Sequence, residues 1–137
     1  MKIYYKHTLM LLFLPLLWIG CYDDLPIDED GLLITERAEC YVSRFELLGV
    51  DYNTVRAGGK DAVIDTLACT IDIEVKWATD LKNLYPQFTL AQDCKLDPKI
   101  TGITDFSDLA NPKKYTVISG NRNVKKTYTV NIKIQER

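Results

Sequence analysis

Four thiols and a single imidazole are the side chains of this 137-residue chain best suited to nucleophilic or metal-binding chemistry. The one histidine, His7, lies in an apolar N-terminal segment. If that segment is removed, no imidazole remains, which excludes Ser-His-Asp and Cys-His nucleophile systems and histidine-ligated metals. No carboxylate pair stands out either, so we predict a non-enzymatic protein with no catalytic residue, no metal site and no cofactor.

The N-terminal segment has the pattern of a signal peptide. Two lysines lie in its first six residues, residues 8–19 are almost entirely apolar, and the small residue Gly20 precedes Cys21. The apolar run is shorter than the roughly 20 residues that a spanning helix needs, and Pro15 interrupts it. Residues 1–20 are therefore predicted to be a cleaved lipoprotein signal peptide.

The Gly20-Cys21 pair resembles the lipobox of bacterial lipoproteins. In that family the cysteine thiol carries a diacylglycerol and the new amino group is acylated, so the resemblance implies lipidation of Cys21 and a membrane anchor. Two or more acyl chains hold a protein firmly, whereas one chain binds marginally. An ordinary cleaved signal peptide and an uncleaved anchor are the alternatives.

The acidic pair Asp23-Asp24 resembles the surface-export signal of Bacteroidetes lipoproteins. This resemblance implies that the protein is lipid-anchored in the cell outer membrane and exposed at the surface. Charged residues and proline recur up to residue 36, which predicts that residues 21–36 form an acylated, flexible tether. Residues 37–137 then form one domain.

Beyond residue 36 the sequence alternates apolar and polar residues, a pattern typical of strands with one buried face. In residues 67–77 every odd position is apolar, and residues 113–119 and 127–134 are similar. Between the last two lies Gly-Asn-Arg-Asn at 120–123, residue types that favour turns. These two strands are predicted to form a hairpin.

Shorter patterns complete the fold prediction. Residues 40–49 favour a first strand, residues 87–90 and 94–96 favour two short strands, and residues 79–85 favour one helical turn that ends before Pro86. About six short strands in roughly 100 residues predict an all-β domain, an antiparallel β-sandwich of the immunoglobulin-like kind.

The order of several motifs resembles the immunoglobulin-like or cadherin-like modules of Bacteroidetes surface lipoproteins. The motifs are residues 42–45, 79–90 and 96–106 and the Tyr-Thr-Val triplets at 115–117 and 128–130. Many of those lipoproteins belong to glycan-capture and uptake systems. The resemblance therefore implies an accessory or adhesion module whose partner is another envelope protein or a polysaccharide.

Direct carbohydrate binding is the alternative function, because sugar-binding surfaces use exposed aromatic rings. We expect Tyr115 and Tyr128 to lie in the core, together with Trp77, which continues the inward series of its strand. The candidate sugar-stacking rings are Trp77, Tyr85, Tyr52 and Tyr41.

Cys40, Cys69 and Cys94 remain besides Cys21, and an odd number allows at most one internal disulfide. All three fall on predicted inward positions, which favours buried free thiols. A Cys69–Cys94 disulfide is the alternative if the central strands oppose each other.

Two further features concern modification and charge. Asp65-Thr66-Leu67 resembles the short O-glycosylation motif of Bacteroidetes exported proteins, which would place a glycan on Thr66. Without the two lysines of the signal peptide, the 17 basic residues fall to 15 against 19 acidic ones, a net charge of −4. That balance excludes nucleic acid as a partner.

Overall fold

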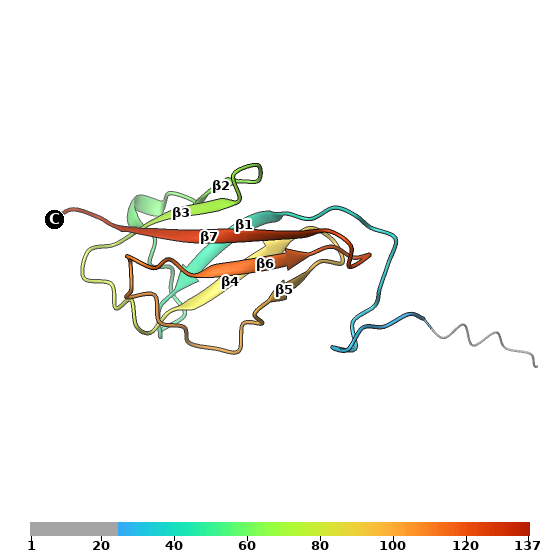
Figure 1. Cartoon of the computed structure of the whole chain (residues 1–137). Coiled ribbons are helices and arrows are strands. Elements are labelled where there is room, and N and C mark those ends of the chain that lie inside the picture. Colours follow the sequence, from blue (N-terminus) through green and yellow to red (C-terminus); the bar gives the residue numbers. More distant parts are fainter. Residues whose placement is uncertain (1–24) are drawn as a thin grey trace, which may run out of the picture.

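The computed structural model describes residues 25–137, which fold almost entirely into β-strands (Figure 1). The predicted signal peptide and Cys21 lie outside the described residues. Among residues 25–137, no helix has the length and apolar character needed to cross a membrane.

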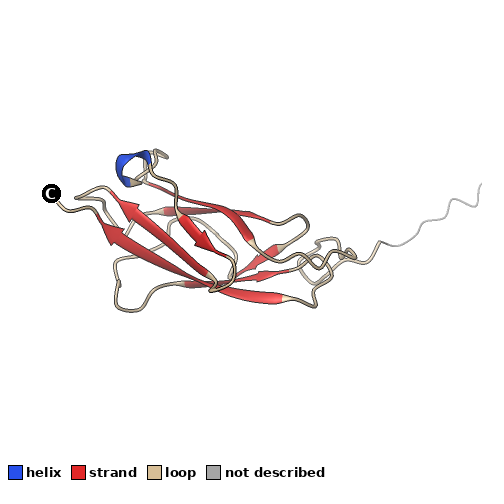
Figure 2. Ribbon diagram, turned by 90° about the horizontal axis from the view of Figure 1, so that it is seen from above, coloured by secondary structure: helices blue, strands red, loops and turns tan. Residues whose placement is uncertain are grey.

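Two sheets of unequal width form the domain. The narrow sheet has the order β1-β4, and the wide sheet has the order β2-β3-β7-β6-β5. The sheets pack against each other, which confirms an all-β, sandwich-like fold (Figure 2). The strands of the described residues are β1 (Val42–Leu48), β2 (Val63–Asp65), β3 (Thr70–Val75), β4 (Tyr85–Leu90), β5 (Lys95–Asp97), β6 (Lys114–Ile118) and β7 (Lys125–Ile134), with a short 3-10 helix, η1 (Ala57–Gly59).

Strand β7 pairs in opposite senses on its two sides. β6 and β7 form the predicted antiparallel hairpin, with Tyr115 opposite Tyr128. On its other side β7 pairs with β3 in parallel, with Ile71 opposite Val130. The prediction of a purely antiparallel sandwich is therefore wrong at this pair. Alternation of apolar and polar residues sets which face is buried, but it carries no information on strand direction.

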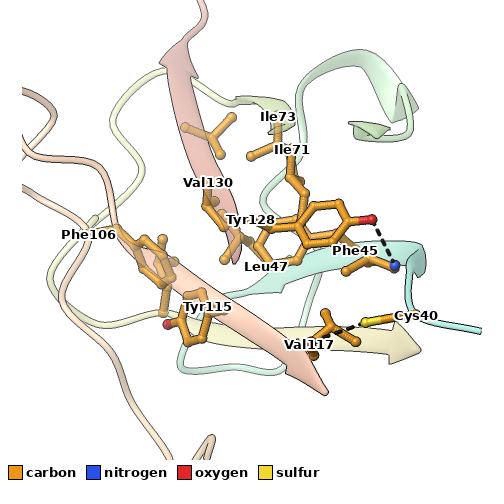
Figure 3. Close-up of a cluster of buried hydrophobic side chains, with 13 residues drawn as sticks. Cys40, Phe45, Leu47, Ile71, Ile73, Phe106, Tyr115, Val117, Tyr128 and Val130 are labelled. Atoms are coloured by element: carbon orange, nitrogen blue, oxygen red, sulfur yellow. Dashed lines mark hydrogen bonds between the residues drawn. The ribbon is translucent and has the colours of Figure 1, made fainter. Parts of the chain in front are cut away.

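The core lies between the sheets and is built from the inward residues of both (Figure 3). The ring of Tyr128 is fully buried, and its hydroxyl accepts a hydrogen bond from the backbone N–H of Val42 on β1 at 3.4 Å. Burial raises the pKa of Tyr128. Phe88 of β4 packs on Tyr115 of β6, with ring centroids 4.8 Å apart. Tyr115 and Tyr128 are thus core residues, as predicted.

The segment before β3 differs from the prediction of one long strand over residues 67–77. Residues 66–69 form a tight turn between β2 and β3, in which the Asp65 carboxylate accepts the N–H groups of Leu67 and Ala68 at 2.9 and 2.8 Å. Leu67 is 95% exposed, and Cys69 has a positive φ of 55°. An aspartate bonded to the backbone ahead of it is a turn signal, and here it outweighs the alternation.

Residues 79–85 do not form the predicted helical turn. The Asp80 carboxylate accepts the N–H of Lys82 at 3.0 Å, which closes a turn. β4 then begins at Tyr85 and includes Pro86. Proline inside a strand is tolerated on a sheet edge, and in the described part of the chain β4 pairs only with β1.

The core assignment predicts a large difference between two chemically identical substitutions. Leu47 is fully buried on β1, so Leu47→Ala is expected to lower the free energy of unfolding by about 2–5 kcal/mol. Leu67→Ala, at an exposed turn, is expected to change it by less than about 0.5 kcal/mol. Urea unfolding followed by circular dichroism measures both, and equal losses would contradict the assignment.

Candidate functional site

One end of the sandwich is closed by a segment that joins the two sheets. Thr54 forms a bridge with Leu48 at the end of β1, and Arg56 forms a bridge with Val75 at the end of β3. Between them, the N–H of Val55 donates to the carbonyl of Leu47 at 3.1 Å. The loops that follow β1 and β3 therefore gather at the same end of the domain (Figure 1).

Two tyrosines stack at this end. The rings of Tyr52 and Tyr85 lie 4.9 Å apart at an interplanar angle of 19°, and Tyr52 is 67% exposed. Tyr85 starts β4 opposite Leu48. Tyr52 lies in the loop after β1, where its N–H donates to the carbonyl of Gly49 at 2.9 Å. Stacking on Tyr85 restricts the rotation of the exposed Tyr52 ring, so a ligand that covers it loses little further side-chain entropy. The exposed ring can pack against a flat apolar ligand surface.

The stack also affects the chemistry of the phenols. The neighbouring Tyr52 hydroxyl raises the pKa of Tyr85. The Tyr85 phenol therefore stays protonated near pH 7 and can donate as well as accept hydrogen bonds.

Trp77 lies at the same end, but not in the core. It is 48% exposed, and the guanidinium of Arg137 lies 4.9 Å from its ring centroid. The predicted burial is wrong because β3 ends at Val75. A turn follows in which Ala78 has a φ of 62°, so the inward series does not continue to position 77.

Tyr41 lies at the opposite end of the sandwich from the other three candidate rings. It precedes β1 and is 42% exposed, and its carbonyl accepts the N–H of Ala91, just after β4. The structure therefore brings together Tyr52 and Tyr85, places Trp77 on the same end across the bridging segment, and separates Tyr41 from them.

Cys40, Cys69 and Cys94 are free thiols, so the alternative Cys69–Cys94 disulfide is not formed. Cys40 is buried and donates to the carbonyl of Val117 at 3.1 Å (Figure 3), while Cys94 donates to the carbonyl of Glu39 at 3.1 Å. Burial raises the pKa of both thiols. Cys69 is only partly buried, contrary to the prediction, and donates within the β2–β3 turn to the carbonyl of Thr66 at 3.7 Å.

The carboxylates of the described residues do not gather into a group that could hold a metal ion. Within residues 25–137, no three His, Cys, Asp or Glu side chains are close enough to hold a metal ion. Asp72 accepts a hydrogen bond from the Asn131 side chain at 2.8 Å on the polar face of the wide sheet. This is a cross-strand contact that stabilises the sheet.

An ionic cluster at the end opposite the tyrosine stack was missed from the sequence. Asp28 lies beside Lys95 and Arg122, at 2.8 and 3.0 Å. Lys95, together with the backbone N–H groups of Leu32 and Asp30, holds the pKa of the Asp28 carboxyl well below its usual range, and Asp28 in turn raises the pKa of Lys95. Nothing in the sequence pairs Asp28 with a lysine 67 positions away.

The fold is a two-sheet β-sandwich module with exposed aromatic rings at one end. A family model described as SGBP, N-terminal, matches residues 53–132, which is more than half of the sequence. The chain therefore belongs to this family, whose members are Bacteroidetes surface proteins associated with glycan binding. No curated protein is detectably similar to it in sequence.

Two solved structures share the fold. One is a proposed glycoside hydrolase from Bacteroides thetaiotaomicron, with 29% sequence identity, 73% of this chain covered and a TM-score of 0.58. The other is a DUF4623 family protein from Bacteroides eggerthii, with 17% identity, 72% covered and a TM-score of 0.50. This chain spans only 26% and 22% of those proteins, respectively.

The thiol environments predict slow alkylation. Cys40 and Cys94 are expected to react with iodoacetamide at pH 8 at least about tenfold more slowly in the folded protein than in urea, because burial lowers both access and the thiolate fraction. Their rates are expected to rise only at more alkaline pH, since the pKa of each thiol is raised. Peptide mass spectrometry measures each rate, and equal folded and unfolded rates would contradict burial.

Proposed function

We propose that this chain is a non-enzymatic accessory module of a glycan-capturing surface assembly, anchored to the outer membrane by lipid on Cys21. The observation that carries the proposal is that two features lie at opposite ends of the module. The acidic segment that follows Cys21 docks at one end, and the exposed aromatic rings lie at the other. Such a module separates its anchor from a recognition surface.

The surface chemistry is compatible with this role. The wide sheet carries a polar outer face in which Asp72 pairs with Asn131, and the hydroxyls of Thr116 and Thr127 lie 2.9 Å apart. The partners that we propose are the membrane, through the lipid, and another envelope protein or a polysaccharide at the aromatic end. The mature net charge of −4 disfavours nucleic acid.

Direct carbohydrate binding is the second candidate, and the Tyr52–Tyr85 stack is the observation that favours it. Tyr52 offers an open ring face that one apolar side of a pyranose can cover, and Tyr85 fixes the orientation of that ring. Family membership supports this candidate as well, since the family is associated with surface assemblies that bind glycans.

Thr66 remains a proposed O-glycosylation site. It occupies the exposed β2–β3 turn, ordered by the Asp65 carboxylate, where an enzyme can reach the hydroxyl. A glycan there would lie on an edge of the wide sheet, because β2 is its terminal strand.

The anchor proposal predicts that Cys21→Ala abolishes lipid labelling. In cells fed an alkyne fatty acid, the variant is expected to carry less than about a tenth of the label of the unchanged chain and to leave the membrane fraction, because acyl chains supply the anchoring energy. Cys40→Ala is the matched control and should label normally. Persistent labelling of Cys21→Ala would disprove the anchor.

The carbohydrate alternative predicts an effect that depends on position. If the soluble 22–137 fragment binds any polysaccharide on a glycan array, Tyr52→Ala is expected to weaken that binding by at least about fivefold, since a truncated anchor ring is costly. Tyr41→Ala removes an exposed ring from the opposite end and should leave affinity unchanged. Equal losses in both variants, or none in Tyr52→Ala, would exclude the stack as the binding site.

A further inference from the structure

Residues 26–35, which precede the sandwich, are folded. We call residues 26–35 the strap. Ile27 forms an antiparallel bridge with Leu33, and the N–H of Asp28 donates to the carbonyl of Leu32 at 2.9 Å. The N–H of Ile34 donates to the carbonyl of Pro26 at 2.7 Å. The strap is therefore a small hairpin, which differs from the flexible tether expected from its charge and proline content.

One carboxylate fastens the strap to the sandwich. The Asp28 side chain is only 3% exposed and accepts hydrogen bonds from Lys95 Nζ at 2.8 Å and Arg122 Nε at 3.0 Å. It also accepts the N–H groups of Asp30 and Leu32, both at 3.0 Å. A carboxylate with four donors, two of them cationic, is held by charge-assisted bonds on both oxygens.

The β6–β7 turn completes the attachment. Arg122 donates from its second terminal nitrogen to the carbonyl of Leu33 at 3.0 Å, and the N–H of Thr35 donates to the carbonyl of Gly120 at 3.0 Å. A Cβ atom at position 120 would collide with Thr35 Oγ1, so glycine lets the strap approach the turn closely. Arg122 thus joins the Asp28 carboxylate to the backbone of the strap, and the bond between Thr35 and Gly120 adds a second point of attachment.

The position of the strap sets the geometry of the whole module. It lies on the turn where β7 begins at Lys125, whereas the tyrosine stack lies at the end where β3 and β7 finish. Ten residues of β7 span about 30 Å. Cys21 precedes Pro26 by five residues, a reach of at most about 18 Å.

We propose that the strap is a rigid coupling, fastened by Asp28, that fixes the orientation of the module on the membrane and holds the Tyr52–Tyr85 end away from the lipid. The membrane part of this proposal rests on the proposed lipid anchor at Cys21. The fastening itself does not, because its contacts lie within residues 26–122.

Hydrogen exchange tests the fastening without any lipid. Asp28→Asn keeps the size of the side chain but removes its charge, and it is expected to speed amide exchange at Leu32, Ile34 and Thr35 at least about tenfold, with Tyr128 unaffected. Glu29→Gln is the matched control, because this neighbouring carboxylate is 84% exposed and lies 3.4 Å from Lys95. It should leave exchange unchanged.

A second variant reaches the strap by another route. Gly120→Ala is expected to free the same three amides by pushing Thr35 away, with the core amide of Tyr128 reporting that the domain is folded. Exchange in the strap of the unchanged protein as fast as in Asp28→Asn, or no effect of either variant, would overturn the proposal.

Energy transfer tests the orientation on vesicles of phosphatidylethanolamine and phosphatidylglycerol that carry acceptor lipid. The lipidated full chain bears a donor fluorophore at Lys82, an exposed residue of the β3–β4 loop at the aromatic end. The unchanged protein and Glu29→Gln are expected to give one narrow donor–membrane distance of at least about 30 Å. Asp28→Asn should give a broad distribution that includes shorter distances.

The outcomes separate the two proposals. Failure of every variant to bind vesicles would refute the lipid anchor, while the exchange result would still decide whether Asp28 fastens the strap. Binding with the same distance distribution in all variants would refute the rigid coupling and leave the anchor intact.

Discussion

The two-sided pairing of β7 is the constraint on which the rest of the structure depends. Its hydrogen bonds hold β6 on one edge and β3 on the other, and Tyr128 projects from it into the space between the sheets. A phenol buried there needs a hydrogen-bond partner, and the N–H of Val42 supplies it. One strand thus fixes the order of the wide sheet and the position of the narrow sheet that covers it.

Periodicity predicts the parts of this fold in which one face of a strand meets the core. Ile71, Val117 and Val130 follow the alternation and are buried, and the β6–β7 hairpin is where the residue types of the turn place it. Periodicity fails at strand ends, because turns formed by side-chain hydrogen bonds to the backbone, or by residues with positive φ, end the strand there. Asp65 ends β2 and Val75 ends β3, so Leu67 and Trp77 are exposed although the pattern places them inward.

The candidate sites show the same division between local and distant information. Aromatic residues are visible in the sequence, but the stacking of Tyr52 on Tyr85 depends on how the loop after β1 folds back on β4. The contact of Asp28 with Lys95 and Arg122 joins segments that are 67 and 94 positions apart. Composition alone assigns such an acidic segment to a solvated chain, and only the three-dimensional arrangement of its cationic partners reveals its order.

The edges of the two sheets affect whether neighbouring copies of the module can add strands to one another. Unpaired strand edges invite the backbone of a neighbouring molecule to add on, and the risk grows when many copies share one plane. Here the wide sheet ends in two strands of three residues each, and β4, one of the two strands of the narrow sheet, contains Pro86, which has no N–H to offer. The borders of the wide sheet are therefore short and one border of the narrow sheet contains a proline, which limits the places where a neighbouring copy could add a strand.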